Sequence, residues 1–200
     1  MKHLLTSLLA LGAAFVALAA PAAPDALVKQ VSSEVVDAIR VERGRGGEVP
    51  IGKVITLVEA KVLPHINFQR MTASAIGRHW REATPQQRAQ LQEEFKALLV
   101  RTYAGALSQL QEQTIYLRPL RMAADDTDVV VRTQVKGQGE PIQLDYRMEK
   151  TTTGWKIYDV NILGIWLVEQ YRNSFAQEIG VNGVDGLIKR LTERNKAARA

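Results

Sequence analysis

The chain has 200 residues, of which 46% are hydrophobic and 24% are charged, and its formal net charge is +5. This composition is typical of a folded protein with one well-packed core and excludes a mainly disordered chain. The chain contains no cysteine, which excludes disulfides, thiol catalysis and thiolate metal sites.

The first residues have the layout of a secretory signal peptide. A positive start at Lys2 precedes an uncharged apolar run from Leu4 to Leu18, and small residues follow it. We expect residues 1–19 to be removed, with cleavage as late as Ala22 as the other possibility. Because residues 1–19 carry one lysine and no acidic residue, cleavage lowers the formal charge from +5 to +4. The alternative is an uncleaved membrane anchor, although a spanning helix needs about 20 apolar residues.

Apolar residues spaced three and four apart predict three helices in the first part of the mature chain. Asp25 and Asn67 are placed to cap the first and the third of them, and Pro64 ends the second. We expect these helices over residues 25–41, 51–63 and 67–80.

The strongest helix signal begins at Thr84. Thr84 occupies the N-cap position, Pro85 the first helical position and Gln87 the third, which is a capping-box pattern. The apolar stripe behind it continues to residue 111, so the predicted helix is about 40 Å long. We expect this helix to cover the apolar face of a sheet.

Alternating apolar and polar residues predict three strands, over residues 128–136, 142–149 and 155–163. A weaker strand over 114–122 contains Pro119, which indicates the edge of a sheet. In the last strand Ile157 is out of phase with Val160, which predicts either a β-bulge near Asp159 or burial on both faces. Together the strands form a twisted, four-stranded antiparallel sheet with one apolar face.

Two further helices are expected after the sheet, over residues 164–179 and 184–194, with Gly180 ending the first. The chain shows no internal repeat and no change of composition, so residues 20–200 are expected to form one domain. The predicted fold class is α+β, with N-terminal helices, then the sheet, then C-terminal helices that pack back. If the helices over 84–111 and 164–179 stand off from the sheet, an apolar cavity lies between them.

No catalytic motif stands out in the sequence. His65 follows the predicted helix over 51–63 and His79 falls in the one over 67–80, without a carboxylate in a metal-ligand pattern. Three aspartates at positions 125, 126 and 128 lack the rest of a calcium loop, so we interpret them as a solvated turn. We therefore expect no catalytic residue, no bound metal and no cofactor.

Asp159 is the one carboxylate inside an apolar strand. It could act as a general base, because burial raises the pKa of a carboxyl group. We favour a structural role, in which it accepts hydrogen bonds from the backbone or from an arginine such as Arg172. An enzyme that acts on apolar substrates would instead lose its turnover in the Asp159→Asn variant.

The chain resembles the MlaC family of periplasmic phospholipid-binding proteins, which is also known as the toluene-tolerance (Ttg) family. The similarity covers residues 25–195, and one departure is Trp166, where many members have serine. The residues that carry it are Val62-Leu63-Pro64, Phe68, Met71, Thr84-Pro85, Phe95, Leu98, Leu99, Tyr103, Trp155 to Val160, Gly164 to Leu167, Tyr171-Arg172, Phe175 and Gly183 to Leu187.

This resemblance implies a periplasmic carrier that is not an enzyme and that holds phospholipid acyl chains between a twisted sheet and helices. It implies two partners, an outer-membrane lipoprotein and porin complex (MlaA-like) and an inner-membrane ABC transporter subunit (MlaD-like). The protein would then help to maintain outer-membrane lipid asymmetry. We expect a monomer that does not bind nucleic acid, with bound phospholipid as cargo. The direction of transport and the number of bound acyl chains stay open.

Strand and helix phase selects the residues expected to contact the lipid. They are Leu99, Tyr103, Leu107, Val131, Leu144, Tyr146, Val160, Ile162, Ile165 and Trp166. A different interpretation remains open, in which the apolar face is ordinary core and the protein is a periplasmic adaptor or chaperone that carries no lipid.

Overall fold

The computed structural model describes residues 22–110, 112–137 and 139–197, so the predicted signal peptide lies outside the described residues. The helices are α1 (Pro24–Gly46), α2 (Ile51–Lys61), the short 3-10 helix η1 (Leu63–His65), α3 (Phe68–Ile76), α4 (His79–Glu82), α5 (Pro85–Ser108) and α6 (Leu167–Ala197). The strands are β1 (Thr114–Leu117), β2 (Asp128–Lys136), β3 (Ile142–Thr151), β4 (Gly154–Ile162) and β5 (Ile165–Trp166).

The helix starts confirm two of the three predicted caps. The Asn67 side chain accepts a hydrogen bond from the Arg70 backbone N–H, and the Thr84–Gln87 capping box is complete. The predicted Asp25 cap is wrong, because Ala23 is the N-cap residue of α1 and Asp25 lies inside its first turn. Pro24 at the first helical position explains the earlier start, because proline lacks the N–H that would otherwise need a partner there.

Two helix boundaries differ from the prediction because of glycines with positive φ. The helix expected over 67–80 is divided into α3 and α4 by Gly77, whose φ is 65°. The two helices expected after the sheet are both present within α6, but a kink at Gly183, where φ is 72°, separates them, so the first helix continues past the predicted end at Gly180. Glycine can adopt left-handed backbone angles without steric cost, and an apolar pattern does not show which glycine will do so.

The strands form one antiparallel sheet in the order β1-β2-β3-β4-β5. It has five strands instead of the predicted four, because Ile165 and Trp166 turn back and pair with the end of β4. The predicted bulge is confirmed, since Arg147 pairs with Asp159 while Met148 pairs with Ile157. Tyr158 is therefore the extra residue, and it brings Ile157 onto the same face as Val160.

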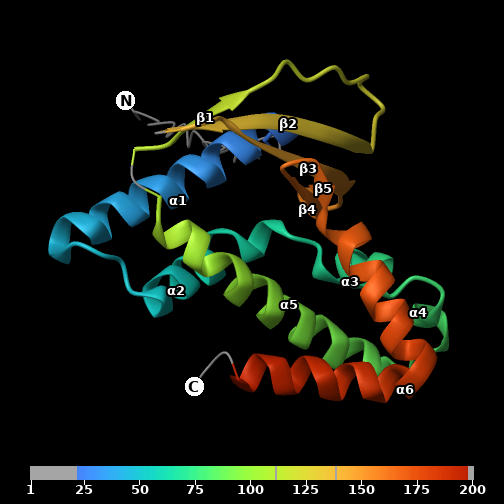
Figure 1. Ribbon diagram of the computed structural model, residues 1–200. Coiled ribbons are helices and arrows are strands. Elements are labelled where there is room, and N and C mark those ends of the chain that lie inside the picture. Colours follow the sequence, from blue (N-terminus) through green and yellow to red (C-terminus); the bar gives the residue numbers. More distant parts are fainter. Residues whose placement is uncertain (1–21, 111, 138, 198–200) are drawn as a thin grey trace, which may run out of the picture.

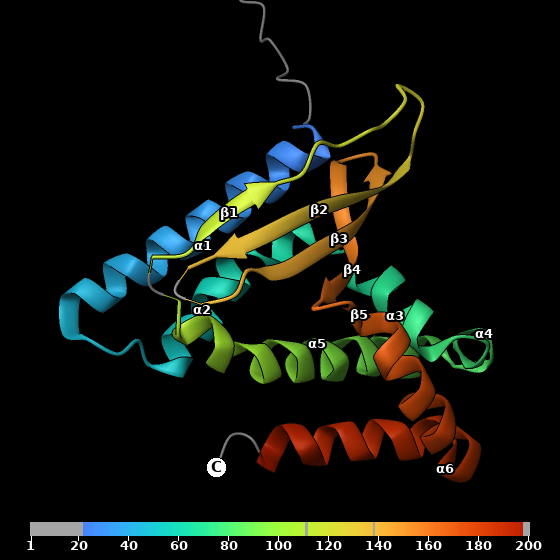
Figure 2. The ribbon, with the colours of Figure 1, turned by 45° about the horizontal axis from the view of Figure 1, so that its top comes forward.

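The helices form a layer on the apolar side of the sheet, as Figures 1 and 2 show. Helix α1 runs along β1 and β2 and packs against both strands. Helix α5 packs mainly against α6, α2 and α3, whereas the sequence predicted that it would lie directly on the sheet. The described part of the chain contains no helix that is long and apolar enough to span a membrane.

The buried apolar residues fall into three clusters. One joins α3, α5 and α6 around Phe95, whose ring meets those of Tyr171 and Phe175 edge-on at 5.1 and 5.2 Å. A second lies between α1 and the sheet, and a third joins α1, α2 and α5. Val160 packs against both of the first two clusters. Because Val160 lies on the apolar face of the sheet, this face connects the two clusters.

Candidate functional site

The register of the sheet sets the predicted strand residues side by side on one face. Val131 on β2 is paired with Tyr146 on β3, and Tyr146 is paired with Val160 on β4. The next row towards the other end of these strands contains Leu144 and Ile162. Paired residues in an antiparallel sheet point to the same side, so these five form one continuous apolar surface.

One end of this surface, which we call the covered end, is tightly packed. It consists of Val129, Val131, Met148, Trp155 and Ile157, all buried against Leu27, Val28 and Val31 of α1. Val131 and Met148 are both 0% exposed. The covered end is therefore filled by protein side chains.

The opposite end of the same face, which we call the open end, is not covered in this way. It consists of Ile142, Leu144, Ile162 and Ile165 on this face, together with Leu163 in the turn that joins β4 to β5. Leu144 and Ile162 are partly buried, whereas Ile142, Leu163 and Ile165 are 44%, 65% and 55% exposed. Apolar surface thus continues from the core to the outside at this end. Surface of this kind marks a binding site more often than it serves stability.

A strained turn holds the tip of the open end. Leu163 has a φ of 53°, which is unusual for a residue other than glycine, and Gly164 follows with a φ of 90°. The Leu163 backbone N–H donates to the carbonyl oxygen of Gln143 at 3.1 Å. This turn pairs Ile165 with Ile162 and so adds Ile165 to the apolar face.

The predicted helix residues pack in two different clusters. Leu99 belongs to the cluster around Phe95, and Tyr103 packs against that cluster together with Ile162. Leu107 packs against the cluster formed by α1, α2 and α5. The structure thus brings Leu99 and Tyr103 near the sheet residues, while Leu107 lies further along α5.

Trp166 does not share a face with the other predicted lipid contacts. It pairs with Asn161, whose neighbour Ile162 points to the apolar side, so Trp166 lies on the outer face of the sheet. There the Arg147 guanidinium lies over its ring, with 3.9 Å from Cζ to the ring centroid. The sequence grouped Trp166 with Ile165 because the sharp turn into β5 was not recognised.

Asp159 has the structural role that the sequence favoured, with a different arginine. Its Oδ1 accepts hydrogen bonds from the backbone N–H groups of Val160 (2.9 Å) and Val168 (3.0 Å), and Arg147 donates to its Oδ2 at 3.0 Å. Arg172, the predicted partner, donates instead to the Ser74 carbonyl oxygen. Burial raises the pKa of Asp159 against these hydrogen bonds and the positive charge of Arg147. The carboxylate therefore ties the end of β4 to the start of α6.

Tyr146 is the polar group at the centre of the apolar face. Burial raises its pKa to about 12, although its hydroxyl interacts with the side chains of Ser32 and Thr133. The phenol thus stays neutral at physiological pH and adds no charge to the site. A site without a charged side chain is suited to an apolar ligand, because a buried charge next to apolar groups is unfavourable.

The two histidines discussed above lie apart and have separate environments. Burial lowers the pKa of His65, and the Nδ1 atom of His79 lies 2.8 Å from Glu82 on the same helix. Among the described residues there is no group of three or more His, Cys, Asp or Glu side chains that could hold a metal ion.

Sequence reasoning missed three residues of this site. Ile142 and Leu163 belong to the open end, and Ile66, just after η1, packs between the two clusters that meet at Val160. Ile66 is held there because Asn67 donates its backbone N–H to the Ile157 carbonyl oxygen at 2.8 Å. The strand phase of Ile142 could have identified it. Ile66 forms an isolated β-bridge with Ile157 and Leu163 lies in a turn, so strand or helix periodicity identifies neither.

The family model for "MlaC protein" matches residues 29–193 of the chain. The chain belongs to the MlaC family. This confirms the resemblance seen in the sequence, and the mixed helix and sheet fold agrees with it.

Three proteins illustrate what this MlaC-family chain is similar to. It is 22% identical over 178 residues, 87% of this chain and 83% of the relative, to the intermembrane phospholipid transport system binding protein MlaC of Haemophilus influenzae. It is 33% identical over 106 residues, 52% of this chain and 49% of the relative, to the toluene tolerance protein ttg2D of Pseudomonas putida.

A solved structure shares a higher sequence identity with this chain than these two relatives do. The phospholipid-binding protein of Ralstonia solanacearum, determined in complex with a phospholipid, is 48% identical and superimposes with a TM-score of 0.83. The match covers 90% of this chain and all of that chain.

Proposed function

We propose that this protein is a phospholipid carrier of the cell envelope and that it shelters acyl chains between the open end of the sheet and helices α5 and α6. The observation that carries the proposal is the apolar surface that runs from the partly buried Val160 to the exposed Leu163 and Ile165. The phospholipid bound to the Ralstonia solanacearum relative supports the same cargo.

We assign the cargo to eight of the ten residues selected from the sequence. Tyr146 and Val160 would form the deep end of the site, and Leu144, Ile162 and Ile165 its mouth. Val131 is left out, because helix α1 fills the space above it and it is 0% exposed. The facing wall would come from Leu99, Tyr103 and Leu107 on α5. Trp166 is left out, because it lies on the outer face.

The energetics favour a carrier whose partners control transfer. Each buried CH₂ group is worth about 0.8 kcal/mol against water, so sheltering about ten methylenes contributes about 8 kcal/mol per acyl chain. A bilayer shelters the same methylenes equally well. A partner therefore needs to change the balance by only a few kcal/mol to load or unload the protein.

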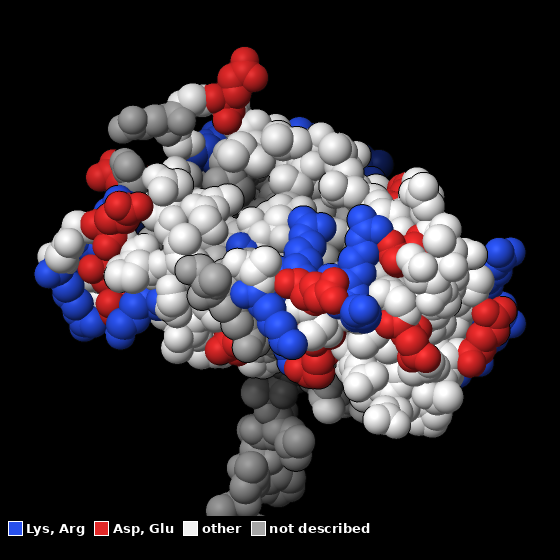
Figure 3. Space-filling model, turned by 60° about the horizontal axis from the view of Figure 1, so that its bottom comes forward, with Lys and Arg blue, Asp and Glu red and all other residues white. Residues whose placement is uncertain are grey.

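The headgroup is expected to stay outside and to be recognised weakly. The side formed by α5 and α6 carries basic and acidic side chains beside one another, with broad uncharged areas between them (Figure 3). Pairs such as Lys96 with Glu93 and Arg190 with Glu178 neutralise one another there. We expect phosphatidylethanolamine and phosphatidylglycerol to bind within a few-fold of each other. Loss of binding on exchanging one for the other would contradict a headgroup that stays in solvent.

The partners and the location follow from the same proposal. The carrier would work in the periplasm, between an outer-membrane MlaA-like complex and an inner-membrane MlaD-like transporter subunit. The transporter would supply the energy, so this chain would need neither an active site nor a cofactor. Its function would be to maintain the lipid asymmetry of the outer membrane.

The decisive experiment is native mass spectrometry of the mature protein purified from periplasm, followed by lipid extraction under denaturing conditions. A one-to-one adduct that proves to be a diacyl phospholipid is the expected result. A protein without lipid, which also takes up none from vesicles, would overturn the proposal and favour the adaptor.

A matched pair of variants assigns the lipid to the apolar face. Leu144→Asp puts a charge at the mouth and should remove the adduct while the circular dichroism spectrum stays that of a folded protein. Gln134→Asp puts the same charge on the opposite face, on the neighbouring strand, and should keep the adduct. Lipid bound to a folded Leu144→Asp protein would show that the acyl chains lie elsewhere.

A further inference from the structure

A hollow on the other edge of the sheet is separate from the apolar site. It has a volume of about 420 Å³ and lies between β2 and the loop that joins β1 to β2. We call it the arginine hollow, and its lining residues are Pro119, Leu120, Arg121, Asp126, Asp128, Val129, Val130 and Arg132.

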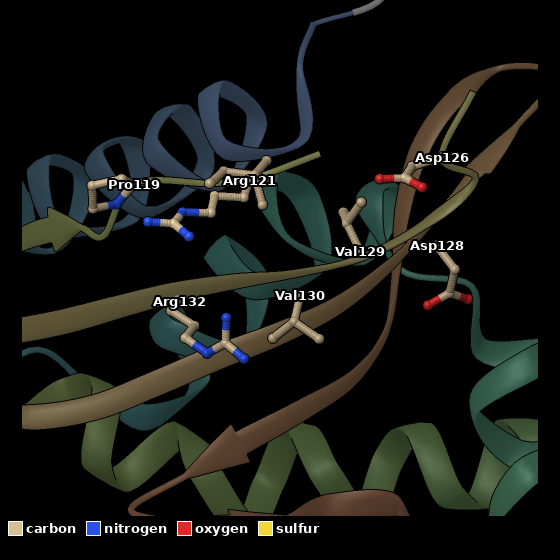
Figure 4. A pocket seen from close by; sticks show the side chains of 8 residues that line it. Pro119, Arg121, Asp126, Asp128, Val129, Val130 and Arg132 are labelled. Atoms are coloured by element: carbon tan, nitrogen blue, oxygen red, sulfur yellow. The ribbon is translucent and has the colours of Figure 1, made fainter. Parts of the chain in front are cut away.

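The charges in the arginine hollow are separated along its length (Figure 4). The guanidinium groups of Arg121 and Arg132 lie at one end, and the carboxylates of Asp126 and Asp128 lie at the other. Within the described chain, neither guanidinium has a hydrogen-bond or ion-pair partner. Asp128, by contrast, binds Arg70 at 2.7 Å and accepts a hydrogen bond from the Tyr158 hydroxyl. The hollow therefore offers two free positive charges at one end.

The hollow also exposes the edge of a strand. The last bond from the β1 side is donated by the Arg118 N–H to the Arg132 carbonyl oxygen at 2.9 Å. Pro119 follows, and the chain leaves the sheet. Bonds to each neighbour alternate along an antiparallel strand, so the backbone groups of Val130 and Asp128 point to the same side as those of Arg132.

No described residue takes the place of β1 beside Val130. Val129 and Val131 pair with Met148 and Tyr146 of β3, which leaves the Val130 N–H and C=O directed into the hollow. An unpaired strand edge is a template for another strand. The side chains of Leu120 and Val129 form an apolar floor beneath it.

We propose that the arginine hollow binds an extended acidic segment of a partner protein, which adds to β2 as a short strand beyond the end of β1. Its backbone would bond to Val130 and Asp128, and an aspartate or glutamate side chain would lie between Arg121 and Arg132. Strand addition gives affinity through main-chain bonds and selectivity through the side chains beside them.

A peptide explains this hollow better than a simple anion does. A phosphate or a lipid headgroup would use the two arginines but would leave the strand edge unused. An acidic strand uses both features. The proposal does not depend on the lipid cargo, because the hollow meets the apolar face only at Val129, in the covered end that protein side chains fill.

The test is a titration of the isotopically labelled mature protein, followed by NMR of its backbone amides. The probe is a synthetic peptide of alternating valine and glutamate, capped at both ends. We expect the amide signals of Val130 and Arg132 to move in a saturable way. The same peptide with lysine in place of glutamate should not bind.

Three controls separate the parts of the proposal. Removing both guanidiniums (Arg121→Ala with Arg132→Ala) should weaken binding about tenfold, since each exposed charge pair contributes up to about 1 kcal/mol. Arg118→Ala removes a nearby positive charge that does not line the hollow and should leave the affinity within about twofold. A peptide with N-methyl groups on alternate residues should not bind.

Several results would overturn the proposal. These are an absence of shifts at millimolar peptide, equal binding of the lysine peptide, or binding of the N-methylated peptide. Equal shifts with inorganic phosphate or with phosphatidylglycerol vesicles would show an anion site or a membrane contact instead. Running the titration on lipid-free and on lipid-loaded protein keeps this result separate from the carrier function, because the expected outcome is the same for both.

Discussion

The covered end and the open end of the apolar face are built from the same kinds of residue and have opposite surroundings. At the covered end, helix α1 fills the space above Val131 and Met148, which are 0% exposed. At the open end, Leu163 and Ile165 remain more than half exposed. The comparison teaches that hydrophobicity alone does not decide between core and binding surface. What decides is whether another element of the chain covers the residue.

The largest effect is expected from a cavity at the covered end. Met148→Ala should lower the free energy of unfolding by about 2–5 kcal/mol, because the residue is fully buried and its surroundings relax only partly. Lipid content should be unchanged. The measurement is urea denaturation together with native mass spectrometry.

The matched variant at the open end is Ile162→Ala. We expect it to cost only about 1–2 kcal/mol, because Ile162 is partly exposed, and to lower the fraction of protein that carries lipid. If both variants lost stability equally and kept their lipid, the two ends would not differ in the way described.

Alkaline pH should lower the free energy of unfolding, because of Tyr146 next to the covered end. Burial raises the pKa of Tyr146 to about 12, whereas an ordinary tyrosine titrates near 10.0. Between these values the folded protein binds more protons than the unfolded chain, so stability falls as pH rises. From Tyr146 we expect a loss of about 2 kcal/mol by pH 12.

Tyr146→Phe should flatten this part of the stability profile, measured by urea denaturation at pH 9 to 12. Tyr116→Phe is the control, since Tyr116 is 49% exposed on the edge strand β1. The same slope in both variants would mean that the Tyr146 hydroxyl is not held in the buried state described here.

The smallest effect is expected at the tip of the open end and should have the opposite sign. Leu163→Gly should raise the free energy of unfolding by about 0.5–1 kcal/mol, because glycine adopts the positive φ without steric strain. Leu163→Ala keeps the strain and should give no gain. Both should slow lipid transfer between vesicles if the exposed leucine contacts the cargo or a membrane. Unchanged transfer would leave Leu163 without a role in the open end.

Much of the fold follows from local patterns. The Thr84–Gln87 capping box, the Asn67 cap, the three long strands and the bulge beside Asp159 were all predicted, because each depends on residues close in sequence. The misplaced boundaries at Gly77 and Gly183 depend on backbone angles that a glycine permits but does not require. Their conformation is selected by the packing of the segments on either side.

The site was predicted less completely, for a related reason. Strand phase placed Leu144, Tyr146, Val160 and Ile162 on one face, and the register agrees. Strand periodicity does not extend past the turn at Leu163 and Gly164, so the sequence grouped Trp166 with Ile165, whereas the strand pairing puts these two residues on opposite faces. The partner of Asp159 was also missed, since Arg147 is its neighbour on the adjacent strand and not in sequence.

The sequence by itself determined the family, the order of helices and strands, and the residues of the apolar face, because these depend on composition, periodicity and local motifs. Only the tertiary structure decided which end of that face is covered and which is open. That outcome depends on where α1 lies across β1 and β2 and on the packing of α5 against α6, α2 and α3 in place of the sheet. It is a property of the packed elements together, and no single segment encodes it.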